Sequence, residues 1–334
     1  MTAIVEPIIR NQRIGLKLQT PRLHAELLSR SIDSAAYSAS AQSILKAVNH
    51  WQQTGYVIED ACVLALFQRA ASASNSADAS SLGTFGSDWI TDVGCFPELI
   101  DHSVARRAER AFAEMSNPNP GIYPIVDRLD QLEMMLKAGA LILQLRIKSE
   151  QLTPEIRMQI REAISISRQY PSCQLFINDF WQVAIEEGAY GVHLGQEDLL
   201  IADLNAIQVA GLRLGVSSHA FWEVARALSI RPSYVACGPL FPTRAKAMPW
   251  IPQGIDNLFY WTRLIPHPVI GIGGVNSENL GAIRATGCGS ASVIQAIVGA
   301  DDPIQAFRSL QQQWNRTPVL REKLPALARP TLAA

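Results

Sequence analysis

The sequence predicts an α/β protein whose main part is a (β/α)8 barrel, preceded by a small, mainly helical N-terminal region. After Gly121, short runs with high strand propensity alternate with segments of helical periodicity, and this unit occurs eight times. The strand runs are almost continuously apolar, which is typical of parallel strands buried on both faces. Hydrophobic residues make up 48% of the 334 residues and charged residues 18%, enough for a large packed core. A doubly wound open sheet is the alternative, but that fold gives no reason for the number of strand–helix units to be eight.

The eight predicted strands share short runs of Val, Ile, Leu and aromatic residues. They are Ile122–Val126, Leu141–Leu145, Leu175–Ile177, Val192–Leu194, Leu214–Val216, Tyr234–Cys237, Val269–Ile272 and Ala291–Ile294. The helices between and after them have apolar residues at three- and four-residue spacing. They are Leu129–Ala138, Pro154–Tyr170, Trp181–Glu187, Ala202–Val209, Phe221–Leu228, Ile255–Ile265, Asn279–Ala285 and Pro303–Trp314. This order predicts a barrel domain at residues 117–315 and a loose, Pro-containing tail at 316–334.

Residues 1–116 lack this alternation of strands and helices, and the sequence patterns that can be recognised there are helical. Three segments carry this expectation: Ser43–Trp51, Ile58–Arg69 and the charged Val104–Met115. The Ser/Ala-rich stretch at residues 70–86 has little to bury and predicts a linker. A turn cluster at residues 117–121 (NPNPG) marks the start of the barrel.

Charge and cysteine content limit the classes of partner and compartment. The chain has 29 Lys+Arg and 30 Asp+Glu, a net charge of −1, without the basic excess of a nucleic-acid or membrane-surface protein. Its longest apolar run, Ala61–Phe67, is far shorter than the roughly 20 residues of a membrane span. The five cysteines are scattered without a C-x-x-C pair, which disfavours a disulfide framework or a zinc cluster. We expect a cytoplasmic protein with small-molecule substrates and no nucleic-acid or membrane partner, and leave a homo-oligomer open.

The second predicted strand ends in three polar residues that alternate with apolar ones: Gln144, Arg146 and Lys148. The two-residue period puts them on one face, and at the carboxyl end of a barrel strand that face is the mouth, where active sites lie. An amide, a guanidinium and an ammonium group together predict a site for phosphate oxygens. The alternative is an edge strand with a solvated charged face, which a closed barrel does not contain.

The third and fourth strands lead into carboxylates. Asn178 and Asp179 follow the third strand, and Asp198 follows the fourth. Carboxylates leaving neighbouring strands can reach one cation, and hard oxygen ligands beside a polyphosphate indicate Mg²⁺. The alternatives are that Asp179 caps the helix beginning near Trp181 and that Asp198 is a turn residue. His193, within the fourth strand, is interpreted as a packed barrel residue.

The remaining strands predict a second anion site. The fifth leads to Ser217, and the sixth leads to Thr243 and Lys246. Gly273-Gly274 follow the seventh strand, and the eighth ends at Ile294-Gln295. Glycines after strand seven and a helix start after strand eight are typical of phosphate sites in barrels. The mouth is therefore expected to hold a diphosphate with its metal at strands two to four and a phosphate at seven and eight.

Taken together, residues from about 121 to 307 resemble thiamine-phosphate synthase. Seven motifs carry the resemblance, in order and at family-like spacing: Tyr123–Asp127 (YPIVD), Gln144–Lys148 (QLRIK), Phe176–Asp179 (FIND), Gly191–Asp198 (GVHLGQED), Gly215–His219 (GVSSH), Gly238–Lys246 (GPLFPTRAK) and Gly271–Val275 (GIGGV). The resemblance implies a TIM barrel that joins 4-amino-2-methyl-5-(diphosphooxymethyl)pyrimidine to a thiazole phosphate and releases diphosphate.

The resemblance also implies roles for individual residues. Positions matching the family's pyrimidine and diphosphate site are Gln144, Arg146, Lys148, Asn178, Ser217 and Lys246. Those matching its Mg²⁺ ligands are Asp179 and Asp198, and those matching its thiazole-phosphate site are Thr243, Gly274, Ile294 and Gln295. Diphosphate departure builds negative charge that Mg²⁺, Arg146, Lys148 and Lys246 would stabilise. The thiazole nitrogen then attacks the pyrimidine cation, so no protein nucleophile is required.

Two departures from the family pattern lie in the thiazole-phosphate site. Ala245 stands where the family commonly has Thr, and Gln295 where it commonly has Ser. A lost hydroxyl donor typically costs about 1 kcal/mol, so we expect weakened binding there. The departures favour one alternative, a non-catalytic pyrimidine-diphosphate-binding or regulatory homologue. The other alternative, a thiazole tautomerase on the same fold, needs no diphosphate site.

The N-terminal region lies outside this resemblance. Ser38–Ala71, and Gly55–Arg69 in particular, resembles the C-terminal end of hydroxymethylpyrimidine-phosphate kinase, an enzyme sometimes fused to this synthase. Residues 38–41 (SASA) stand where that kinase has a G-[ST]-G-[CD] loop, and the chain has no room for its nucleotide-binding core. We therefore expect a remnant without kinase activity.

Overall fold

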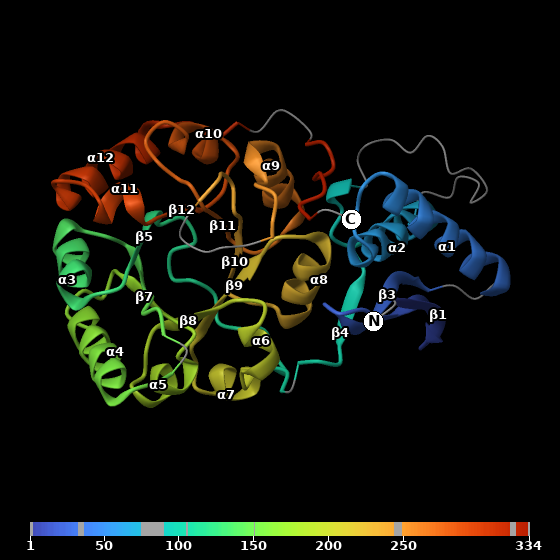
Figure 1. The fold of residues 1–334 in the computed structure, drawn as a ribbon, viewed down its shortest axis with the longest axis horizontal. Coiled ribbons are helices and arrows are strands. Elements are labelled where there is room, and N and C mark those ends of the chain that lie inside the picture. The colour runs from blue at the N-terminus through green and yellow to red at the C-terminus, as the bar shows by residue number, and fades with distance from the viewer. Residues whose placement is uncertain are drawn as a thin grey trace.

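The structure is a computed structural model in which an antiparallel sheet with two helices lies beside a closed parallel barrel (Figure 1). It describes residues 3–32, 37–74, 90–104, 106–149, 151–243, 249–320 and 325–332. One continuous apolar core extends through both parts. Among the described residues, no helix combines the length and the apolar character needed to span a membrane. All five cysteines are buried free thiols.

The predicted barrel is confirmed, with eight parallel strands closed into a ring by pairing of the last with the first. The strands are β5 (Gly121–Val126), β6 (Ile142–Leu145), β7 (Gln174–Asn178), β8 (Gly191–Leu194), β9 (Arg213–Ser218), β10 (Tyr234–Cys237), β11 (Val269–Ile272) and β12 (Ser290–Val293). The helices around them are α3 (Leu129–Ala138), α4 (Pro154–Ser167), α5 (Trp181–Glu186), α6 (Asp198–Ile201), α7 (Leu204–Val209), α8 (Phe221–Ile230), α9 (Gly254–Leu264), α10 (Leu280–Ala285), α11 (Gln295–Val298) and α12 (Pro303–Arg316). Two of these, α6 and α11, are short helices in the loops after β8 and β12.

The barrel interior is filled by aromatic side chains facing glycines. Tyr123, Phe176 and Tyr234 form an inner cluster separate from the main core. A Cβ on Gly215 would lie 2.1 Å from Cζ of Tyr234, and a Cβ on Gly191 would lie 2.6 Å from the Phe176 ring. Large residues on some strands therefore require glycine on their neighbours, which keeps the interior packed rather than hollow.

The N-terminal region is mixed, so the expectation of a mainly helical region is corrected. It contains β1 (Ile4–Arg10), β2 (Arg13–Gln19), β3 (His24–Ile32) and β4 (Glu98–Asp101), paired antiparallel in that order. In β2, Leu16 and Leu18 are buried while Lys17 is exposed. This two-residue alternation is typical of a strand with one solvent-exposed face. The expected helices Ser43–Trp51 and Ile58–Arg69 lie within α1 (Tyr37–Gln53) and α2 (Ile58–Ser74).

Two other expectations for the N-terminal region need correction or lie partly outside the described residues. The segment Val104–Met115, of which residue 105 is not described, contains no helix and runs along the barrel, where Phe112 N–H donates to Arg231 C=O at 3.0 Å. Its tertiary contacts replace the helix that its composition suggested. In the expected linker at 70–86, α2 continues to Ser74, and residues 75–89 lie outside the described part.

The C-terminal tail is not loose over residues 325–332. The Tyr56 hydroxyl donates to Ala328 C=O at 2.6 Å, and Asn257 Nδ2 donates to Arg329 C=O at 3.0 Å. The tail thus runs between α2 and α9, near the N-terminal region (Figure 1). Hydrogen bonds from the side chains of two separate parts of the fold to the tail backbone hold it there.

Candidate active site at the carboxyl end of the barrel

Except for Lys246, the predicted diphosphate- and metal-site residues lie on or just after four consecutive strands of the ring. Gln144 is on β6, Asn178 ends β7, and Ser217 is on β9, while β8 leads through a short loop to Asp198. Because β6, β7, β8 and β9 are hydrogen-bonded neighbours, their carboxyl ends share one sector of the mouth. The closed ring places these side chains together although 73 residues separate Gln144 from Ser217.

A buried polar network forms the floor of this sector. The Tyr234 hydroxyl lies 3.0 Å from the Tyr123 hydroxyl and 2.8 Å from His193 Nδ1. Gln144 Nε2 donates to the Tyr123 hydroxyl at 3.2 Å, and His193 Nε2 lies 2.9 Å from Ser217 Oγ. The two tyrosine hydroxyls and both nitrogens of His193 therefore have partners, as buried polar groups require.

His193 is a packed residue, as predicted. It is buried, and burial together with the positive charge of Arg146 lowers its pKa to about 3, so the ring is neutral near pH 7. Its two nitrogens are both engaged by hydroxyl groups of the network. Tyr123 was not singled out from the sequence, although it faces inward beside Gln144; its place in the YPIVD motif at the end of the first barrel strand was the available signal.

The end of β6 alternates as predicted. Gln144 is buried inside the barrel, while Ile147 packs against the outer core. Arg146 is half-buried, and its charge acts on both His193 and Asp179, which places the guanidinium at the mouth. Lys148 is exposed just beyond. The edge-strand alternative is wrong because β6 lies between β5 and β7 in a closed ring.

Asp179 and Asp198 are in direct contact. Asp179 has a φ of 60°, and its side chain accepts a hydrogen bond from Asn178 Nδ2. Burial, followed by the charge of Asp198 and a hydrogen bond between the two carboxyl groups, raises the pKa of Asp179 to about 7. Two carboxyl groups held this close favour either a shared proton or a cation.

The two alternatives for these carboxylates have different outcomes. The N-cap of α5 is Phe180 without a side-chain hydrogen bond, so Asp179 does not cap that helix. Asp198 does hold a local turn, because its Oδ2 accepts from Gly195 N–H at 3.1 Å, and it still faces Asp179. The turn therefore fixes the direction of the carboxylate rather than competing with a binding role.

The donor set fits Mg²⁺ bound by two carboxylates and substrate oxygens. The described residues contain no cluster of three or more His, Cys, Asp or Glu that could enclose a metal. Mg²⁺ is commonly held by one or two carboxylates, with water and phosphate oxygens completing its octahedron. Asp179 and Asp198, in contact beside Arg146, would supply two such carboxylates next to a guanidinium suited to phosphate.

The second predicted anion site is built on the neighbouring strands β11 and β12. Gly274 has a φ of 68°, and a Cβ there would lie 2.7 Å from Cβ of Phe241, so only glycine fits. Ile294 is the N-cap residue of α11, and Gln295 is exposed. Thr243 is half-buried in the loop after β10. Ala245 and Lys246 fall within residues 244–248, outside the described part.

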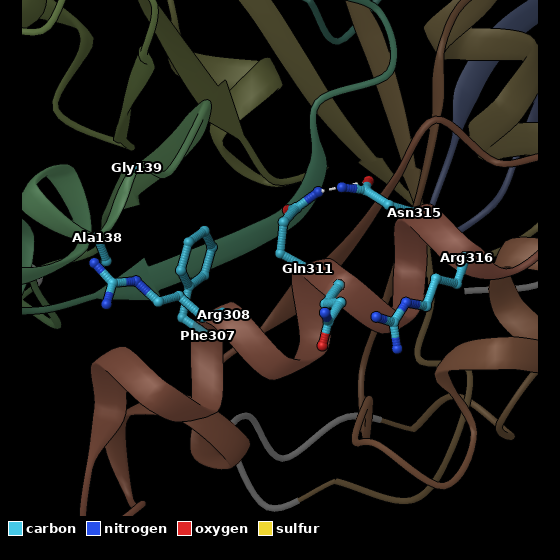
Figure 2. Close-up of a pocket in the computed structure, with 8 residues that line it drawn as sticks. Ala138, Gly139, Phe307, Arg308, Gln311, Asn315 and Arg316 are labelled. Carbon is cyan, nitrogen blue, oxygen red and sulfur yellow. Dashed lines mark hydrogen bonds between the residues drawn. The ribbon is translucent and has the colours of Figure 1, made fainter.

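Two surface cavities lie at the opposite end of the barrel. One of about 380 Å³ is lined by Gly139, which follows α3, and by Gln311 of α12 (Figure 2). The Gln311 side chain also accepts from Ile122 N–H at the start of β5. The other, of about 530 Å³, is lined by Ser233, Pro268 and Gly289, which directly precede β10, β11 and β12. Because barrel chemistry occurs at the carboxyl ends of strands, neither cavity belongs to the candidate site.

Known proteins share the barrel part of the chain. A family model described as thiamine monophosphate synthase matches residues 122–297. The thiamine-phosphate synthase of Photorhabdus laumondii is 49% identical over 193 residues, covering 57% of this chain and 88% of that protein. The corresponding protein of Citrobacter koseri is 48% identical over 191 residues, covering 57% of this chain and 90% of that protein.

A solved structure supports the same relationship. Thiamine phosphate pyrophosphorylase from Pyrococcus furiosus superposes with a TM-score of 0.53 at 28% identity, covering 60% of this chain and 98% of that one. The matched region contains β6 to β9 with their carboxylates and the glycines after β11. The chain belongs to the thiamine monophosphate synthase family.

Proposed function

We propose that the protein is a thiamine-phosphate synthase, a transferase. It condenses 4-amino-2-methyl-5-(diphosphooxymethyl)pyrimidine with thiazole phosphate to give thiamine phosphate and diphosphate. The observation that carries the proposal is the contact of Asp179 with Asp198 beside Arg146 at the barrel mouth. A tautomerase on the same fold has no diphosphate to hold, so this arrangement favours the synthase.

The substrate-binding roles follow the two sectors of the mouth. The pyrimidine diphosphate is held by Gln144, Arg146, Lys148, Asn178, Ser217 and Lys246. The thiazole phosphate is held by Thr243, Gly274, Ile294 and Gln295. Two sectors on one rim allow both substrates to lie side by side, which lowers the entropic barrier to their reaction.

Asp179 and Asp198 are the proposed Mg²⁺ ligands. Mg²⁺ bound there supplies charge neutralisation to the oxygens of the diphosphate. The hydrogen bonds from Asn178 to Asp179 and from Gly195 to Asp198 restrain the two carboxylates, which supports this proposal. The neighbouring Arg146 contributes a second, fixed positive charge.

The reaction breaks the bond between the pyrimidine methylene carbon and the diphosphate oxygen, and the electron pair leaves with the diphosphate. Arg146, Lys148 and Lys246 stabilise the growing negative charge more strongly than the ground state, which is the requirement for catalysis. The methylene cation is delocalised into the aminopyrimidine ring. The thiazole nitrogen donates its lone pair to that carbon, so no protein nucleophile is needed, in agreement with the neutral, fully engaged His193.

The test is a two-substrate assay with the purified full chain and Mg²⁺. We expect thiamine phosphate and diphosphate in equal amounts. If calorimetry detects binding of the pyrimidine diphosphate but saturating substrates give no product, the protein is instead a binding or regulatory homologue. Lys148→Ala is expected to lower kcat about 100-fold, the scale of one preorganised charge. An effect confined to KM would contradict its catalytic role.

We further propose that the protein acts in the cytoplasm on these small molecules and that residues 1–116 are a kinase remnant without kinase activity. Ile58–Arg69 of the resembling segment lies in α2, which packs against α8 of the barrel. A phosphate-transfer assay with hydroxymethylpyrimidine phosphate and ATP is expected to show no product. Formation of the diphosphate would contradict this proposal.

A further inference from the structure

We propose that Asp101 and Arg226 are positioning residues for the synthase reaction. They form an ion pair between the N-terminal sheet and the barrel, and this pair holds the loop between β8 and α6 that carries Asp198. The inference rests on the proposed function, and it gives the N-terminal region a part in the activity of the barrel.

The ion pair is buried and short. Asp101 ends β4, Arg226 lies in the middle of α8, and both side chains are only 3% exposed. Arg226 Nε donates to Asp101 Oδ2 at 2.6 Å, and the other carboxylate oxygen accepts from Ser103 N–H at 2.8 Å. The Arg226 guanidinium also lies over the Trp222 ring, 4.8 Å from its centroid. Each partner is therefore fixed in one orientation.

Arg226 transmits this orientation to the site through Gln196. Arg226 Nη1 donates to Gln196 Oε1 at 2.7 Å, and Gln196 Nε2 donates to Ser217 C=O at 2.6 Å. Gln196 lies in the loop after β8, two residues before Asp198. Its side chain therefore ties the metal-ligand loop to the end of β9, where Ser217 contacts His193.

The N-terminal region also fixes α8, the helix that carries Arg226. The N-cap residue of α8, Ala220, has no side chain that can cap it. Asp60 of α2 takes this role across the junction and accepts from Trp222 N–H at 2.9 Å. Near the other end, Leu99 N–H of β4 donates to Ser229 Oγ at 3.1 Å. In Figure 1, β4 and α2 lie directly beside α8.

Charge makes the arrangement dependent on Asp101. With Asn in place of Asp101, the buried Arg226 guanidinium keeps amide partners, including Gln196 Oε1, but loses the carboxylate that balances its charge. A buried, unpaired guanidinium reorients toward water or another acceptor, because an uncompensated charge is strongly disfavoured in the interior. The expected consequence is a mobile β8–α6 loop and weaker Mg²⁺ binding at Asp198, with the thiazole-phosphate sector on β11 and β12 unaffected.

The experiment compares Asp101→Asn with Glu98→Gln in the full chain. Glu98 is on the same strand and pairs with Arg13 of β2 at 2.7 Å, within the N-terminal sheet and away from the barrel. We expect Asp101→Asn to raise the Mg²⁺ concentration for half-maximal rate about tenfold and to leave the KM for thiazole phosphate unchanged. Amide hydrogen exchange of residues 195–201 is expected to become faster. Glu98→Gln is expected to change neither measurement.

Gln196→Ala keeps the buried ion pair and tests the same path if Asp101→Asn does not fold. We expect it to reproduce the shift in Mg²⁺ dependence and the faster exchange. In the Gln196→Ala background, Asp101→Asn is expected to add less than twofold to that shift, because both changes break one path. If the two substitutions multiplied their effects on the Mg²⁺ dependence, the inference would be overturned. Unchanged amide hydrogen exchange of residues 195–201 in Gln196→Ala would overturn it as well. A wild-type chain without turnover would instead overturn the proposed function, whereas the exchange comparison would still report on the loop.

Discussion

The buried carboxyl group of Asp60 at the junction between α2 and α8 makes stability depend on pH in a defined direction. Burial raises its pKa to about 7 from an ordinary value of 3.8, and the nearby Glu223 and Glu59 contribute to the increase. Backbone hydrogen bonds from Trp222 and Phe221 oppose it without cancelling it. Arg22 pairs with Glu59, not with Asp60.

The sign follows from proton binding. Between about pH 4 and pH 7 the folded state keeps a proton on Asp60 that the unfolded chain has lost, so the free energy of unfolding falls as pH rises through this interval. The difference of about three pKa units corresponds to about 4 kcal/mol of lost stability by pH 8. Asp60→Asn keeps an oxygen for Trp222 N–H and cannot ionise. The variant is therefore expected to exceed the wild type by about 2 kcal/mol at pH 5, where the unfolded chain has already lost the proton, and by about 4 kcal/mol at pH 8.

Urea unfolding at pH 5, 6, 7 and 8 measures this difference. The matched control is Asp302→Asn, because Asp302 also accepts a backbone N–H at a helix start, from Gln305 at 2.9 Å, but is exposed. Titration of Asp179 and His193 is common to all three proteins and cancels in the comparison. A difference between Asp60→Asn and the wild type that is constant with pH would refute the reasoning.

Three further predictions concern the metal site, the barrel interior and the junction. Asp179→Asn is expected to lower kcat at least 100-fold and to remove its dependence on Mg²⁺, measured by diphosphate release; an unchanged Mg²⁺ titration would contradict the ligand role. Gly215→Ala is expected to lower the free energy of unfolding by about 3 kcal/mol because its Cβ would overlap Tyr234. Its control, Gly281→Ala in α10, meets nothing within 4 Å and is expected to be neutral or to stabilise by up to about 1 kcal/mol. A chain that begins at residue 117 exposes the apolar face of α8 and is expected to aggregate in size-exclusion chromatography, whereas a monomeric product with the wild-type melting temperature would contradict this.

The sequence predicted the barrel well because its signals are local. Short apolar strands and amphipathic helices are set by neighbours a few residues apart, and they gave the eight units with small boundary errors. The same local period placed Gln144 and Arg146 on the inner face and Ile147 on the outer one. Chain order also placed Asp179 and Asp198 at the ends of adjacent strands, so their contact could be expected from the sequence alone.

The N-terminal region was harder to predict because competing local signals were present. Helical patterns in α1 and α2 dominated the interpretation, while the alternation in β2 is short and its partner β3 is needed to bury Leu16 and Leu18. The fourth strand, β4, comes after residues 75–89, which lie outside the described part, and so far from β3 that no hairpin signal joins them. A strand of four residues is defined by its pairing rather than by its own composition.

By itself, the sequence determined the repeating strand–helix order, the polar residues at the strand ends and the family to which they point. Only the tertiary structure decided that Asp101 meets Arg226, 125 residues later, and that Gln196 connects this pair to the end of β9. It also decided that His193 and Tyr123 share a hydrogen-bond network through Tyr234. Periodicity encodes which face of an element is buried, whereas the partner of a buried charge depends on how whole elements pack, and that packing brings together residues with no sequence relation.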